Sequence, residues 1–195
     1  MQSNVKDPRL LAAFRRVPRH LFVPEGQRRA SYHDSALPIG FEQTISQPSM
    51  LAIMLSALAL EPGDRVLEIG GGSGYAAALL AELTREVYTI EIVPELAAQA
   101  AARLSKLGYV NAQVRVANGR MGLAEHAPYE KILVSAGASD VPTELVQQLA
   151  KGGRIAIPVG DESGQTLLVG NKDSAGQLSW LRSIPCIFVP LVERR

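Results

Sequence analysis

Glycine residues follow an apolar run in the stretch VLEIGGGSGY, which spans Val66–Tyr75. The run predicts a buried strand that ends at Ile69. Gly70, Gly72 and Gly74 would then turn the chain into a helix, since glycine adopts positive φ and lets a ligand approach the backbone. The pattern indicates a binding loop for a nucleotide-containing ligand, with a plain connecting turn as the alternative.

Two glutamates flank this loop and narrow the choice of ligand. Glu91 ends the next predicted strand, 91 − 70 = 21 positions after Gly70, close to the spacing of about 20 residues for an acidic residue that binds ribose hydroxyls. Glu68 precedes the loop, and a carboxylate there suits a cationic amino-acid group better than a pyrophosphate. Tyr75 stands where a dinucleotide site has its third glycine. These residues favour S-adenosylmethionine over a nicotinamide cofactor.

A third candidate loop is VANGRMG, Val116–Gly122, after another predicted strand. Asn118 could offer its side-chain carbonyl to the amino group of an adenine, and Gly119 would allow close approach of the backbone. Asn-Gly is also a common plain turn, so both interpretations stay open. The same dipeptide is a plausible site of deamidation.

Two hydroxyl groups, Thr44 and Ser46, lie in the stretch PIGFEQTISQPSM, Pro38–Met50. They precede Pro48 and a predicted helix. Ser46 could therefore cap that helix or present its hydroxyl to a ligand, and the local sequence does not separate the two roles.

The elements that would position these residues alternate between strand and helix, which predicts a mostly parallel α/β sheet covered on both faces. The predicted strands are Arg65–Ile69, Glu86–Glu91, Ala112–Ala117, Lys131–Ala136 and Gly153–Val159. The predicted helices are Asp7–Arg16, Pro48–Leu60, Tyr75–Leu83, Pro94–Leu107 and Pro142–Ala150. Residues Phe22–Gln43 read as an irregular lead-in, and Gln165–Val169 and Ser179–Val189 as an antiparallel pair.

Composition argues against a nucleic-acid partner, a disulfide, a metal site and a membrane anchor. The 195 residues fit one domain, and a net charge of +1 with 5% aromatic residues disfavours a nucleic-acid partner. One cysteine, Cys186, and three scattered histidines predict neither a disulfide nor a metal site. The stretch Met1–Phe22 carries charges throughout, so we expect no signal peptide and no membrane anchor. A soluble, cytoplasmic protein is expected.

The chain resembles the protein-L-isoaspartate (D-aspartate) O-methyltransferase family over nearly its whole length. The N-terminal pieces that carry the resemblance are VPRHLFVP (17–24), SYHDSALPIG (31–40), QTISQP (43–48) and VLEIGGGSGY (66–75). The remaining pieces are NGRMGLAEHAPYEKILVSAGA (118–138), VPTELVQQLAKGGRIAIPVG (141–160) and FVPL (188–191). TISQP together with two separate FVP pieces is the most specific part of this combination.

The resemblance implies a class I S-adenosylmethionine-dependent methyltransferase fold, Rossmann-like, with an antiparallel C-terminal hairpin and an N-terminal helical and irregular extension. It implies a single domain over 1–195, with a substrate and lid segment at 1–60, a cofactor core at 61–160 and C-terminal strands at 161–195. The implied reaction is methyl transfer to the free carboxylate of L-isoaspartyl or D-aspartyl residues in damaged proteins, which initiates repair and leaves S-adenosyl-L-homocysteine. A monomer that acts on isoaspartyl proteins or peptides is expected.

The resemblance also implies the site residues. Ser46 takes the position of the family's active-site serine, and no metal is involved. The implied cofactor contacts are Thr44, Ile45, Ser46, Glu68, Gly70, Gly72, Ser73, Gly74, Glu91, Ile92, Asn118 and Gly119. A carboxylate is already ionised at neutral pH, so its methylation requires no general base, and Ser46 could donate a hydrogen bond to the non-attacking oxygen.

Two departures from the family pattern bear on the substrate. Asn118 replaces the usual Asp, and Glu42 adds a negative charge close to a site that should receive a carboxylate. The alternatives are therefore a related carboxyl methyltransferase for another peptide or small-molecule acid, or a catalytically weakened relative that still binds S-adenosylmethionine. Away from the site, Asp34 is expected to have a structural role, as a cap or as a brace of the lead-in, and Cys186 to be a buried, inert thiol.

Overall fold

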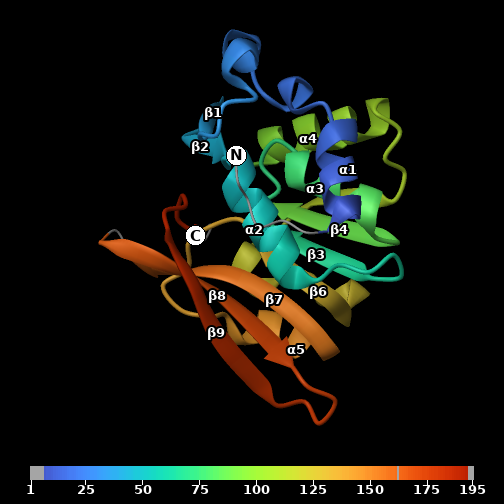
Figure 1. Ribbon diagram of the computed structural model, residues 1–195, viewed down its shortest axis with the longest axis vertical. Coiled ribbons are helices and arrows are strands. Elements are labelled where there is room, and N and C mark those ends of the chain that lie inside the picture. The colour runs from blue at the N-terminus through green and yellow to red at the C-terminus, as the bar shows by residue number, and fades with distance from the viewer. Residues whose placement is uncertain (1–6, 162, 193–195) are drawn as a thin grey trace.

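The computed structural model describes residues 7–161 and 163–192, which fold around a seven-stranded sheet of order β5-β4-β3-β6-β7-β8-β9 (Figure 1). Strands β3 to β7 run parallel to one another, whereas β8 and β9 run antiparallel to their neighbours. The strands are β3 (Arg65–Ile69), β4 (Glu86–Glu91), β5 (Ala112–Val116), β6 (Tyr129–Val134), β7 (Leu149–Asp161), β8 (Gly164–Lys172) and β9 (Leu178–Cys186). The predicted α/β class and the antiparallel C-terminal strands are confirmed.

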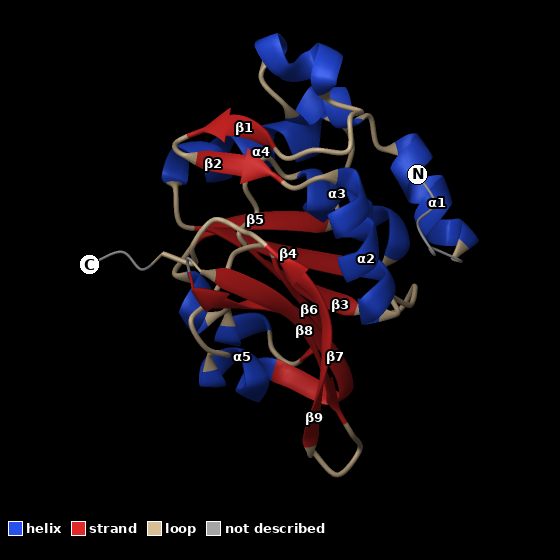
Figure 2. Ribbon diagram, turned by 60° about the vertical axis from the view of Figure 1, so that its left-hand side comes forward, coloured by secondary structure: helices blue, strands red, loops and turns tan. Residues whose placement is uncertain are grey.

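Helices cover both faces of the sheet, as Figure 2 shows. One core lies under α1 to α4 and contains Val66 and Val87, while Leu67 and Tyr88 point into a second core on the side of α5. This alternation follows from the two-residue period of side chains along a strand. The helices are α1 (Pro8–Arg16), α2 (Pro48–Leu58), α3 (Tyr75–Leu83), α4 (Pro94–Lys106) and α5 (Thr143–Gln148). Among the described residues, no helix is both long and apolar enough to cross a membrane.

The predicted irregular lead-in was wrong in part. It contains a 3-10 helix, Glu25–Ala30, and most of a hairpin of β1 (Leu37–Gly40) with β2 (Gln43–Ile45). A further 3-10 helix, Arg19–Phe22, ends where the predicted lead-in begins. The hairpin turns through Phe41 and Glu42, which adopt φ of 54° and 59°. Such turns usually carry Asn or Gly, so this sequence gives no signal for one.

The order of strands places the candidate residues at one edge of the sheet. From β3 the chain builds outward through β4 and β5, then returns to the other side of β3 with β6 and β7. Ligands of such sheets bind beyond the carboxyl ends of the strands, where the order reverses. The glycine loop, Glu91 and the loop after β5 all lie at that edge.

Candidate active site

The glycine loop joins β3 to α3 in the conformation that its sequence predicts. Gly70, Gly72 and Gly74 have φ of 81°, 49° and 84°. The backbone N–H groups of Gly70 and Gly71 both donate to the carbonyl of Ile90, at 2.9 and 3.1 Å, which fixes the loop to β4. Gly74 packs against α4 rather than facing a cavity, because a Cβ there would lie 3.2 Å from that of an alanine in α4.

Glu91 braces this loop from the end of β4. Its Oε2 accepts from the N–H of Gly72 at 2.8 Å, and its Oε1 accepts from the N–H of Val93 at 2.9 Å. The side chain is buried, yet it lines the cavity beside Gly72. A carboxylate has about four acceptor sites, so Glu91 retains capacity for ligand hydroxyls while it holds the loop.

Glu68 is fully buried beneath the same loop. Its Oε2 accepts from the hydroxyl of Thr89 at 2.7 Å, whereas Oε1 has no hydrogen-bond partner among the described residues. Burial raises the pKa of Glu68 to about 8; the hydrogen bond from Thr89 opposes this rise and the charge of Glu91 adds to it. An unpartnered buried oxygen beside a cavity is an acceptor that a ligand can use.

The side chain of Asn118 makes a local hydrogen bond within the loop that follows β5. The Oδ1 atom that we expected to face an adenine accepts from the N–H of Arg120 at 3.0 Å and caps the 3-10 helix Gly119–Met121. Gly119 does line the adjoining cavity. A Cβ at Gly119 would lie 2.6 Å from Ile69 and 2.8 Å from Leu191, so only glycine fits there without displacing a neighbour.

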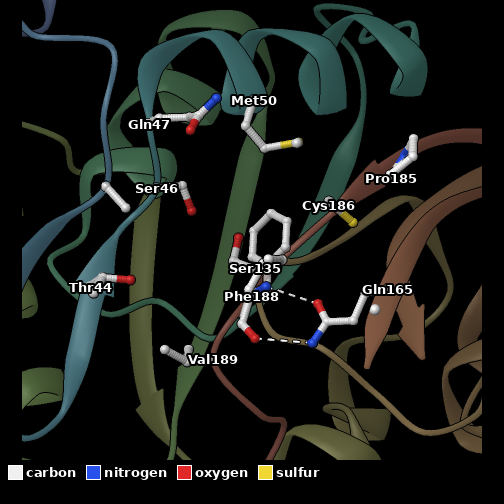
Figure 3. A pocket seen from close by; sticks show the side chains of 13 residues that line it. Thr44, Ser46, Gln47, Met50, Ser135, Gln165, Pro185, Cys186, Phe188 and Val189 are labelled. Carbon is white, nitrogen blue, oxygen red and sulfur yellow. Dashed lines mark hydrogen bonds between the residues drawn. The ribbon is translucent and has the colours of Figure 1, made fainter. Parts of the chain in front are cut away.

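Ser46 does not cap α2, which corrects one of its two predicted roles. The N-cap position is Gln47, one residue later, and Asp34 supplies the capping oxygen by accepting from the N–H of Ser49 at 2.8 Å. Asp34 therefore has a structural role, as predicted, and that role is to cap α2. The hydroxyl of Ser46 has no partner among the described residues and points into a cavity (Figure 3).

That cavity, of about 490 Å³, lies between the start of α2 and the end of β9. Polar groups come from Thr44, Ser46 and Ser135, and apolar walls from Met50 and Phe188. None of the described residues that line it is charged. Cys186 also lines this cavity; it is buried, as predicted, and burial raises the pKa of its thiol.

Two narrower cavities of about 40 and about 30 Å³ adjoin it beneath the glycine loop. The first is lined on one side by Glu91, Ile92 and Gly119, the second by Ile45, Glu68 and Gly70 to Ser73. Thr44 and Ser135 line all three cavities, and Ser46 lines two. Of the predicted cofactor contacts, Gly74 and Asn118 are not among the residues that line these spaces.

The C-terminal segment Pro185–Val192 walls these cavities and is held by two sets of hydrogen bonds. Gly137 donates to Val189 at 2.8 Å and accepts from Leu191 at 2.7 Å. The side-chain amide of Gln165 donates to the carbonyl of Phe188 at 3.0 Å and accepts from its N–H at 2.8 Å (Figure 3). Sequence reasoning missed both Gln165 and Ser135, because no local motif marks either.

Glu42 lies at the exposed tip of the β1–β2 turn and does not line the three cavities. Its negative charge therefore does not face the space that would receive a substrate carboxylate. Among the described residues, no group of three or more His, Cys, Asp or Glu side chains is placed to hold a metal ion.

Comparison with known proteins agrees with this geometry. The family model for protein-L-isoaspartate(D-aspartate) O-methyltransferase matches residues 1–195. Protein-L-isoaspartate O-methyltransferase 2 of Geotalea uraniireducens is 49% identical over 98% of this chain and 88% of its own length. A solved protein-L-isoaspartate O-methyltransferase superposes with a TM-score of 0.87 at 28% identity, over 94% of this chain; the match spans only 61% of that longer chain. A second solved structure, from Plasmodium falciparum and in complex with S-adenosyl-L-homocysteine, gives a TM-score of 0.85 at 25% identity, covering 97% of this chain and 92% of that one. The chain belongs to the protein-L-isoaspartate(D-aspartate) O-methyltransferase family.

Proposed function

We propose that this protein transfers the methyl group of S-adenosylmethionine to the free carboxylate of L-isoaspartyl or D-aspartyl residues in damaged proteins, the step that initiates their repair. The observation that carries the proposal is a cavity with unpartnered hydroxyls and no charge among its described lining residues, which shares Thr44, Ser46 and Ser135 with a second cavity lined by the glycine loop. Family membership and the relatives' named activity support the same reaction.

The residues around the two narrow cavities fit S-adenosylmethionine. The unpartnered oxygen of Glu68 suits the cationic amino-acid end, and Glu91 the ribose hydroxyls. Gly119 lines the space that would take the adenine, and its missing Cβ leaves room for the side chains of Ile69 and Leu191, which wall the same space. Gly74 and Asn118 serve the cofactor indirectly, by shaping the two loops. When bound, the cofactor supplies a methyl group on a positively charged sulfur.

The chain's own task is to orient the substrate carboxylate and exclude water. That carboxylate is ionised at neutral pH, so it attacks without a base. Ser46 donates a hydrogen bond to its non-attacking oxygen, and the apolar side chains of Met50 and Phe188 keep the reacting groups dry. None of the described residues that line the cavity is charged, so none of them competes with the positively charged sulfur for the substrate carboxylate. Thr44 forms part of the wall.

The test compares an isoaspartyl peptide with the otherwise identical aspartyl peptide, with methyl transfer measured for each. We expect transfer to the isoaspartyl peptide and none above background to its twin. Equal transfer to both would favour a broader carboxyl methyltransferase. Calorimetric binding of S-adenosylmethionine without transfer to either peptide would identify an inactive relative.

Glu42→Gln tests whether the charge at this position influences the choice of substrate. Because Glu42 lies outside the cavities, the variant should retain the peptide preference of the wild-type protein. A monomeric state and a cytoplasmic location stay predictions; size measurement by light scattering tests the first.

A further inference from the structure

Ser135 occupies the point where the sheet meets the glycine loop. It directly follows β6, and its N–H donates to the carbonyl of Ile69, the last residue of β3, at 2.8 Å. A Cβ at Gly70 would lie 3.6 Å from the Ser135 carbonyl group. The backbone of Ser135 is therefore fixed by two neighbouring strands and the loop between β3 and α3.

All three cavities of the site meet at Ser135. It lines the large substrate cavity, the cavity beside Glu91 and the cavity beside Glu68. Methyl transfer requires one place that both the cofactor's sulfur and the substrate's oxygen can reach. Residues that line all three cavities mark that place. Among the described lining residues these are Ser135 and Thr44.

The hydroxyl of Ser135 has no hydrogen-bond partner among the described residues. Figure 3 shows that the oxygens of Ser135 and Ser46 point toward the same space, one from the end of β6 and the other from the segment before α2. Two unpartnered donors thus enter the substrate cavity from two different elements, and none of the described residues that line that cavity is charged.

We propose that Ser135 is a second hydroxyl donor to the substrate carboxylate and acts as a pair with Ser46; this inference rests on the proposed function. A carboxylate carries about four lone-pair sites, so it can accept from both hydroxyls and keep one site for attack. Two donors held by separate elements fix the plane of the carboxylate, which one donor cannot do. Attack forms a C–O bond and breaks the methyl–sulfur bond, whose electron pair stays on sulfur, and no proton moves.

The experiment measures three variants against the wild type: Ser135→Ala, Ser135→Thr and the control Ser139→Ala. Ser139 lies four residues along, its exposed hydroxyl donates to Asp140, and it lines none of the three cavities. A hydrogen bond to a charged group corresponds to roughly 10- to 100-fold in kcat/KM for the isoaspartyl peptide. We expect that loss in Ser135→Ala alone, with most activity retained in Ser135→Thr, which keeps the hydroxyl.

Two further readouts separate substrate binding from other roles. S-adenosylmethionine affinity and melting temperature should be unchanged in Ser135→Ala, while the Kd of the isoaspartyl peptide in the presence of S-adenosyl-L-homocysteine rises. Activity within about twofold of wild type overturns the proposal, as does a loss matched by an equal loss of cofactor affinity. Failure of the wild-type protein to methylate the isoaspartyl peptide is a separate result, which overturns the proposed function instead.

Discussion

Replacing Glu68 by Gln should change how the stability of the protein depends on pH. Burial raises the pKa of Glu68 from its ordinary value of 4.5 to about 8. Between these two values the folded state retains a proton that the unfolded state has lost, so the free energy of unfolding falls as pH rises. At about 1.4 kcal/mol for each unit of pKa, the difference amounts to about 5 kcal/mol between pH 4.5 and 8.

Glutamine keeps the shape of the side chain and is neutral at every pH in this range. The hydroxyl of Thr89 can still donate to the amide oxygen, as it does to Oε2 of Glu68. The free energy of unfolding of the variant should therefore decrease much less between pH 4.5 and 8. At pH 8 it should exceed that of the wild type by a few kcal/mol.

Urea unfolding at pH 5, 6.5 and 8 measures this directly, with Glu42→Gln as the control for an exposed carboxylate. The control should follow the wild-type curve. Parallel pH dependence of Glu68→Gln and wild type would refute the reasoning, because Glu68 would then be ionised in the folded protein at neutral pH.

The same group should couple cofactor binding to proton release. A cationic amino-acid end beside Oε1 favours the ionised form of Glu68, so its pKa should fall when S-adenosylmethionine binds. Calorimetry at pH 6.5 in buffers of different ionisation enthalpy should detect the release of up to about one proton in wild type and none in Glu68→Gln. Equal proton release by the two proteins would contradict this role.

Three smaller predictions concern the loops. Gly74→Ala should lower the free energy of unfolding by about 1–3 kcal/mol, because φ there is 84°; an unchanged urea midpoint would contradict this. Gln165→Leu removes both hydrogen bonds to Phe188 and should raise KM for the isoaspartyl peptide by roughly tenfold; an unchanged KM would show that the segment is held without them. The peptide that carries Asn118–Gly119 should gain the mass of deamidation when the protein is aged, and an unchanged mass dismisses this.

The parts of the site that sequence predicted depend on local geometry. The glycine loop has positive φ at the expected positions. Glu91 ends the neighbouring strand, so its carboxylate reaches the N–H of Gly72 in that loop. Both follow from the order of residues along a strand–turn–helix unit, which a local pattern can indicate.

The parts that sequence missed depend on contacts between distant segments. The local sequence made Ser46 a candidate cap for α2. In the structure the N–H of Ser49 instead donates to the carboxylate of Asp34, which lies before the β1–β2 hairpin. Ser135 belongs to the site because it lines all three cavities. Gln165 belongs to it because its side chain bonds Phe188, 23 residues further along the chain. The hairpin itself turns through Phe41-Glu42, which carries no turn signal.

The most direct test of the central claim offers the protein one peptide with several carboxylates. The peptide carries an isoaspartyl residue, a normal aspartyl residue and a free C-terminus, and tandem mass spectrometry locates the methyl ester after incubation with S-adenosylmethionine. The structure and family membership predict an ester on the isoaspartyl carboxylate alone. An ester on the aspartyl side chain or the C-terminus, or no ester from protein that binds the cofactor, would contradict the claim.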